Sequence, residues 1–180
     1  MHRGKREREQ EASARVRSSV ATAIASVQRS SVCSAFDVDI DESNMNKWVV
    51  GFPKETFIPE HPDLYHDLDA WAHRSGQPAS VVVELIFPSH FPRAPPFARV
   101  VRPRFQFHTG HVTVGGSICT SILTLDGWRP DFSGEALLLM LQATLMDGNA
   151  RVDRYNPYDY TEKEAREAFV RVAKDHGWSV

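Results

Sequence analysis

The sequence predicts an α+β fold, in which helices pack on one face and at the ends of an antiparallel sheet. An apolar stripe of helical spacing comes first, four short segments of β character follow, and two or more helices end the chain. Of the 180 residues, 42% are hydrophobic and 24% charged, a balance typical of a soluble globular domain. We therefore expect residues 1–180 to form a single domain, with residues 1–10 as a candidate flexible end.

Residues 5–30 predict the first helix, because their apolar side chains recur at spacings of four, four and three. Residues 1–30 carry seven Lys and Arg against three Glu, whereas the remainder of the chain has a formal charge of −6. This basic helix is either a solvated face or a docking surface for an acidic partner. Nucleic acid is disfavoured, because the body of the chain is acidic. The apolar stripe is Val16, Val20, Ile24 and Val27.

Four strands are predicted next, as an antiparallel meander. In residues 35–41 apolar side chains alternate with aspartates, which indicates a strand with one wet, acidic face. Residues 47–52, 80–87 and 96–101 are the other segments, and prolines follow two of them.

Residues 53–78, between the second and third strands, are too many for a hairpin turn. Leu64, Leu68 and Trp71 recur at helical spacing, so the segment predicts a short inserted helix.

Two helices are predicted after the strands. Ser133 can cap the first at its N-terminus, and Gly148 is expected to end it in a left-handed turn. Thr161 and Glu164 have the spacing of a capping box at the start of the second. An apolar stripe on this last helix consists of Ala165, Phe169 and Val172.

The cysteines and the apolar runs bear on the compartment. Cys33 and Cys119 lie 86 positions apart and form no Cys-x-x-Cys motif, so we expect no disulfide. The first residues contain no apolar stretch typical of a signal peptide, and the apolar run 136–146 is too short to span a bilayer. These features predict a cytoplasmic or nuclear protein that does not contact membranes.

Cys119 lies in a glycine-rich passage between the strands and the last helices, where a rigid scaffold often presents catalytic groups. Gly115 and Gly116 allow a tight turn and leave room for another chain to approach. A lone cysteine is more often a small buried hydrophobe, so composition alone favours a packing role for Cys119 over a catalytic one.

Residues 90–128 resemble the central part of ubiquitin-conjugating enzymes. The shared features are the pair Pro95-Pro96, Cys119 in "GGSIC", and Trp128 soon afterwards. "FPRAPPFARVV", "LLLMLQATLMDGNARV" and the closing "HGW" are similar to the Q-type branch of that family. The resemblance implies the ubiquitin-conjugating-enzyme fold and a single catalytic domain.

The resemblance also implies an activity. Cys119 would accept ubiquitin, or a ubiquitin-like modifier, from an activating enzyme as a thioester, and would pass it to an amine or hydroxyl of a protein substrate, usually with a ubiquitin ligase. No metal or organic cofactor is implied. The alternative is a non-catalytic ubiquitin-binding or scaffold module on the same fold. A cysteine protease and a zinc site at His108, His111 and Cys119 are disfavoured, since no helix follows the cysteine and a fourth ligand is missing.

The catalytic residues carried over from the family depart from its pattern. The family's asparagine, eight residues before the cysteine, is His111 here, where an imidazole could donate to an oxyanion or could simply be a loop residue. The aspartate often found two residues after the cysteine is Ser121. The acid that would orient and deprotonate the acceptor is Asp153 or Asp147.

The resemblance implies two partner surfaces. Lys5 and Arg6 in the first helix would contact the activating enzyme. Loops that face the ligase in the family correspond here to "FPRAPP" and "WRPD", although a packing role is favoured over ligase contact for Trp128. The candidates in these loops are Arg93, Trp128, Arg129 and Pro130.

Overall fold

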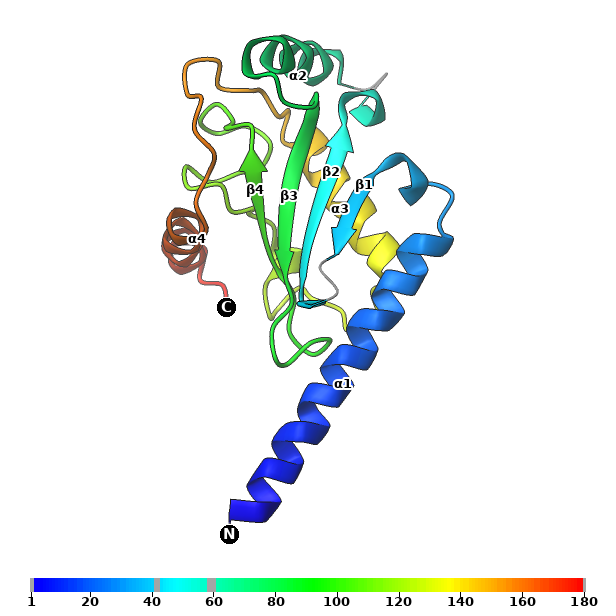
Figure 1. The fold of residues 1–180 in the computed structure, drawn as a ribbon. Coiled ribbons are helices and arrows are strands. Elements are labelled where there is room, and N and C mark those ends of the chain that lie inside the picture. The colour runs from blue at the N-terminus through cyan, green and yellow to red at the C-terminus, as the bar shows by residue number, and fades with distance from the viewer. Residues whose placement is uncertain (1, 41–42, 58–60, 180) are drawn as a thin grey trace.

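A computed structural model describes residues 2–40, 43–57 and 61–179, except for the side chains of residues 2–9 and 12. It confirms the predicted fold class, with an N-terminal helix, an antiparallel sheet, an irregular passage around Cys119 and helices at the C-terminal end (Figure 1). Along the chain the elements are α1 (His2–Arg29), β1 (Asp37–Ile40), β2 (Lys47–Pro53), α2 (Pro62–Ser75), β3 (Ser80–Ile86), β4 (Phe97–Arg102), α3 (Gly134–Asp147) and α4 (Glu162–His176).

The sheet is the predicted meander, and in the described part of the chain it has four strands in the order β1-β2-β3-β4. Val50 of β2 pairs with Val83 of β3, which pairs with Val100 of β4, and all three side chains are fully buried. Because side chains alternate along a strand, these valines share one face of the sheet. Figure 1 shows α3 crossing behind this sheet, while α4 lies beyond its β4 edge.

The valines of the predicted stripe on α1 are buried, and the C-terminal part of this helix packs against the start of α3. Ser30 Oγ donates to Glu135 Oε1 at 2.6 Å, and Glu135 N donates to Ser26 Oγ at 3.2 Å. A Cβ on Gly134 would come within 2.9 Å of the Ala23 carbonyl carbon, so the two helices touch closely. The N-terminal half of α1 extends away from the body of the molecule (Figure 1).

The predicted cap at the start of α3 is confirmed, but the prediction for its end is wrong. Ser133 Oγ accepts a hydrogen bond from Ala136 N at 3.1 Å. Gly148 has φ −77°, whereas Asn149 is left-handed with φ 49°. The reason lies in tertiary structure, because a Cβ on Gly148 would sit 2.6 Å from the Gly110 carbonyl carbon. Gly148 therefore provides close approach, and Asn149, a residue type that tolerates the left-handed region, makes the turn.

The inserted helix and the last helix also form where predicted. α2 buries Leu64, Leu68 and Trp71. Thr161 caps the N-terminus of α4, where its Oγ1 accepts from Glu164 N at 3.2 Å, and Gly177 caps the C-terminus with φ 67°. Its docking on the sheet is partly polar, because buried Arg99 of β4 donates to the carbonyl oxygen of Tyr160 at 2.8 Å, just before the helix.

Candidate active site

Backbone hydrogen bonds fix Cys119 on both sides. Its N–H donates to the carbonyl oxygen of His111 at 2.7 Å, and the preceding Ile118 N donates to Ala98 O of β4 at 3.0 Å. Ile118 is fully buried, whereas Cys119 is of intermediate exposure. Cys33, by contrast, is 3% exposed. The sheet and the turn at His111 thus hold Cys119 at the edge of the core, where its side chain is not enclosed.

The prediction that Gly115 and Gly116 leave room for another chain is wrong, because Tyr160 and α4 of the same chain fill that space. A Cβ on Gly115 would overlap the carbonyl oxygen of Glu164 and lie 2.8 Å from Ala168 Cβ. A Cβ on Gly116, which has φ 96°, would lie 2.5 Å from the Tyr160 ring. The glycines therefore position α4 against the cysteine passage.

Cys119 borders a cavity of about 590 Å³ and another of about 540 Å³. The first lies between residues 107–114 and α4, and its wall includes exposed Phe107 and Val114. The second runs along α3 and the residues after Cys119. Side chains lining both are Cys119, His111, Asp147 and His176. A visiting chain can therefore reach the sulfur, and it meets ionisable groups there.

His111 and Asp147 form a hydrogen-bonded pair beside the cysteine, with 3.0 Å between His111 Nε2 and Asp147 Oδ2. A carboxylate only accepts hydrogen bonds, so the proton of a neutral imidazole is on Nε2 in this arrangement. Nδ1 is then left as a proton acceptor, and it becomes a donor only when the ring is protonated. The pair is therefore suited to general-base work, while donation to an oxyanion requires the imidazolium.

Asp153, the other carboxylate predicted from the sequence, lies elsewhere. Its N–H donates to Arg104 O at 2.7 Å, and its Oδ1 accepts from Tyr155 N at 3.0 Å. Neither cavity beside Cys119 includes Asp153, whereas Asp147 lines both. Of the two carboxylates left open by the sequence, the structure brings Asp147 to the cysteine.

The remaining polar residues of the passage are placed around the cavities. Ser121 is exposed and lines the cavity along α3. His108 is exposed and lines the other cavity, with its ring 3.8 Å from that of Phe107. Within the described residues no group of three or more His, Cys, Asp or Glu side chains is arranged to hold a metal ion.

Partial burial raises the pKa of the Cys119 thiol above its ordinary value. At neutral pH the group is therefore mostly the protonated thiol, and thiolate forms only as a small fraction. Such a sulfur suits exchange with an activated acyl group better than attack on an unactivated amide.

The predicted partner residues fall into three environments. Lys5 and Arg6 lie on α1, and their side chains are outside the described part of the structure. Arg93 is exposed and lines a cavity against α1, while Arg129 and Pro130 are exposed on the loop before α3. Trp128 is 8% exposed and donates from Nε1 to Pro92 O at 2.6 Å, so it packs the base of that surface.

Sequence reasoning missed the contribution of α4 to the site. Arg171, His176 and Trp178 line one or both cavities, and the rings of His176 and Trp178 stack at 4.6 Å. Ser179 O accepts from Leu125 N at 3.0 Å, which ties the end of the chain to the loop after Cys119. The available signal was the closing "HGW", but helical periodicity does not tell which element a helix end faces.

Comparison with solved structures identifies the fold. Human ubiquitin-conjugating enzyme E2 G1 is similar with a TM-score of 0.51 and 21% identity, over 75% of this chain and 94% of that one. The structure therefore has the ubiquitin-conjugating-enzyme fold, as the sequence predicted.

Comparison with curated proteins adds the branch. A Drosophila melanogaster protein named as a Q-like ubiquitin-conjugating enzyme, CG4502, is 32% identical over 150 residues, 81% of this chain and 46% of its own length. The mouse Q-like protein 1 of the same enzyme class is 36% identical over 104 residues, 54% of this chain and 63% of its own length. These matches confirm the resemblance: the chain is related to the Q-type branch of the ubiquitin-conjugating enzymes.

The alignments cover only part of each relative. The aligned part of the chain spans about half the length of the curated relatives it matches. No family model matches the chain. None of the helices among the described residues is both long enough and apolar enough to cross a bilayer.

Proposed function

We propose that the chain is a ubiquitin-conjugating enzyme and that Cys119 carries ubiquitin, or a ubiquitin-like modifier, as a thioester. The observation that supports it best is the setting of Cys119. The residue is fixed through its backbone and open to a cavity on either side, and an Asp147–His111 pair lies beside it. The names of the Q-type relatives favour the same reading.

In the first step the Cys119 thiolate attacks the thioester carbonyl that joins ubiquitin to the activating enzyme. A new carbon–sulfur bond forms, and the activating enzyme's cysteine leaves as thiolate. This exchange needs no strong base, because a thiolate is a good nucleophile and the leaving group is also a thiolate. The raised pKa of Cys119 is compatible with it and limits side reactions of the free thiol.

In the second step an amine or hydroxyl of the substrate attacks the Cys119 thioester, and the nitrogen or oxygen must lose a proton. We assign that proton to Nδ1 of His111, whose Nε2–H is held by Asp147. The Nδ1–H formed in this transfer can then donate to the oxyanion. In this proposal Asp147, rather than Asp153, is the acid that helps to deprotonate the acceptor, and it does so through His111. The Cys119 thiolate is the leaving group, and no metal or cofactor takes part.

The partner surfaces are carried over from the family resemblance. We propose that the activating enzyme binds the part of α1 that extends from the body, which carries Lys5 and Arg6. A ubiquitin ligase would bind the neighbouring surface with Arg93, Arg129 and Pro130, which Trp128 supports from below. We expect the protein substrate, activating enzyme and ligase to be met in the cytosol or nucleus.

A charging assay tests the proposal. The chain is mixed with activating enzyme, ubiquitin and ATP and resolved on a non-reducing gel. A shift by one ubiquitin, removed by reductant, is expected for the natural chain and for the matched control Cys33→Ala, and its loss is expected for Cys119→Ala. His111→Ala should still charge but discharge slowly to an amine, by about 100-fold.

The competing function is a ubiquitin-binding or scaffold module on the same fold. A chain that binds ubiquitin but remains uncharged with several activating enzymes would establish that function instead. Cleavage of a ubiquitin fusion without ATP would indicate a protease.

A further inference from the structure

We infer that the inserted helix α2 positions the active-site turn, and that Thr109 is the positioning residue through which it does so. The route runs from Asp67 on α2 through Arg151 to Thr109, and from there to His111 and Cys119. The inference rests on the proposed function, because the reaction it serves is the discharge of the Cys119 thioester.

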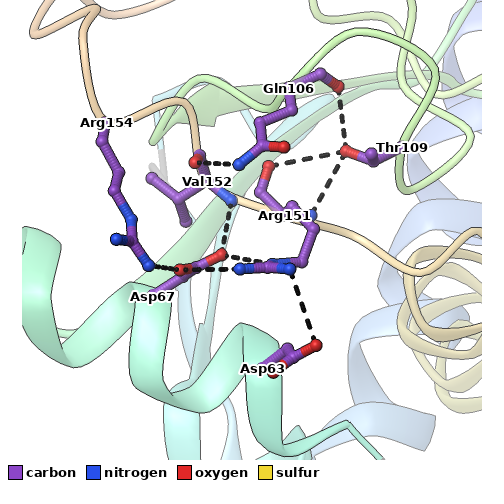
Figure 2. Close-up of polar contacts among 7 residues, drawn as sticks. All are labelled: Asp63, Asp67, Gln106, Thr109, Arg151, Val152 and Arg154. Atoms are coloured by element: carbon purple, nitrogen blue, oxygen red, sulfur yellow. Dashed lines mark hydrogen bonds and ion pairs between the residues drawn. The ribbon is translucent and has the colours of Figure 1, made fainter.

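The first link is a buried ion cluster between α2 and the segment after α3 (Figure 2). The Asp67 carboxylate is 1% exposed, and it accepts hydrogen bonds from Arg151 Nε at 2.7 Å, Arg154 Nη2 at 2.7 Å and Val152 N at 3.2 Å. Asp63, one turn earlier on α2, adds a contact of 3.5 Å to Arg151 Nη1. The cluster fixes residues 151–154 to the helix.

The carboxylate is ionised in this setting. Burial alone would raise the pKa of Asp67, but the hydrogen bonds from Arg151, Arg154 and the Val152 N–H outweigh burial and hold the pKa below its usual value. Charge-assisted hydrogen bonds of this kind are shorter and stronger than neutral ones. The Asp67–Arg151 contact therefore constrains the orientation of Arg151 more tightly than packing would.

The second link joins Arg151 to the turn that precedes Cys119. Figure 2 shows hydrogen bonds of Gln106 and Arg151 meeting at the Thr109 hydroxyl. Arg151 N donates to Thr109 Oγ1 at 3.2 Å, and Thr109 Oγ1 donates to Gln106 O at 2.9 Å. Gln106 N donates to Arg151 O at 2.8 Å, and Gly110 N donates to Gly148 O at 2.7 Å. The Thr109 hydroxyl thus lies between the turn and the segment held by Asp67.

The third link is backbone strain in the turn itself. His108 and His111 both adopt left-handed backbone angles, with φ 61° and 52°. Non-glycine residues persist in this region only where their surroundings over-determine the conformation, and such sites cluster at functional positions. The Thr109 and Gly110 hydrogen bonds supply that constraint on the residues just before His111. His111 in turn accepts the Cys119 N–H and pairs with Asp147.

A variant pair at Thr109 tests the inference. Thr109→Val removes the hydroxyl and keeps the shape, while Thr109→Ser keeps the hydroxyl. Thr109→Val should charge at the natural rate but discharge to an amine about five- to tenfold more slowly, as expected for the loss of one constraining hydrogen bond. Thr109→Ser should discharge at a rate within about twofold of the natural chain, because the serine hydroxyl can keep the same hydrogen bonds.

Two further readouts separate positioning from general stability. Amide hydrogen exchange at Gly110 and Cys119, measured on the uncharged chain, should accelerate in Thr109→Val and not in Thr109→Ser. In a double-mutant cycle, Thr109→Val should add little to the discharge defect of His111→Ala, because the two changes act through the same group.

The inference is overturned if Thr109→Val discharges at the natural rate, if its defect multiplies fully with that of His111→Ala, or if amide exchange at Gly110 and Cys119 is unchanged. These outcomes are distinct from failure of the proposed function, in which the natural chain does not charge at all. Even if the natural chain does not charge, amide exchange at Gly110 and Cys119 still tests whether Thr109 holds the turn in place.

Discussion

Replacing Asp67 by asparagine is expected to lower the free energy of unfolding by about 3 kcal/mol at pH 7. The variant has nearly the same shape, so packing against α2 is preserved and only the charge is removed. Its amide can accept a bond from Val152 N, but it presents no negative charge to Arg151 and Arg154.

The magnitude follows from how each partner is exposed. Breaking a buried ion pair by removing one partner typically costs about 3–5 kcal/mol, because the remaining charge stays buried. Here the side chains of Arg151 and Arg154 are 35% and 54% exposed, so both regain water, which places the loss at the lower end. In a chain of this size the midpoint of thermal unfolding should fall by about 6–12 °C.

The assay is urea unfolding at a series of pH values, with Asp63→Asn as matched control. Asp63 lies on the same helix and contacts the same Arg151, but its side chain is 75% exposed, so its loss should cost less than about 1 kcal/mol. Since the pKa of Asp67 is lowered in the folded state, its contribution is present above the ordinary aspartate pKa and lost as pH falls through the folded value. The difference between natural chain and variant should be constant at neutral pH and shrink below about pH 4.

The reasoning is refuted if Asp67→Asn costs no more than Asp63→Asn at pH 7. It is also refuted if the difference persists undiminished in acid, since a charge interaction must disappear when the carboxylate is protonated.

Three other changes have defined outcomes. Gly115→Ala should push α4 off the cysteine passage and lower the free energy of unfolding, measured in urea, by about 2 kcal/mol. An unchanged free energy would mean that the close packing of Gly115 on Ala168 does not stabilise the fold. Because burial raises the pKa of Cys119, its alkylation by iodoacetamide in a Cys33→Ala background should speed up about tenfold per pH unit to beyond about pH 8.5, and an earlier plateau would contradict the burial. Trp128→Phe should lower the unfolding free energy by about 1–2 kcal/mol through loss of the bond to Pro92 O, whereas an unshifted thermal midpoint would indicate that this bond is immaterial.

Features of the fold that depend on local sequence were predictable. The alternation in residues 35–41 predicts β1, and Ser133 and Thr161 predict the starts of α3 and α4, because strand faces and helix caps are set by neighbours along the chain. The motif around Cys119 made it the predicted nucleophile, and the structure places it half-buried and fixed through its backbone. Its catalytic role stays a prediction.

Features that depend on contacts between distant segments were not predictable. Asp67 lies on a helix with a polar face, and nothing nearby in the sequence indicates that it is buried. Its partners, Arg151 and Arg154, follow it by 84 and 87 positions. Gly148 and Asn149 exchange the expected roles because the turn at Gly110 passes close to Gly148. His176 lines both cavities beside Cys119, and Gly115 leaves the space in which α4 packs.

The central claim is that the Cys119 sulfur carries ubiquitin, and intact mass measurement tests it most directly. After the full chain reacts with activating enzyme, ubiquitin and ATP, the mass should increase by one ubiquitin less one water, and added thiol should restore the original mass. Digestion should place the adduct on Cys119. An adduct that resists thiol and maps to a lysine, or no adduct with any activating enzyme tried, would contradict the account.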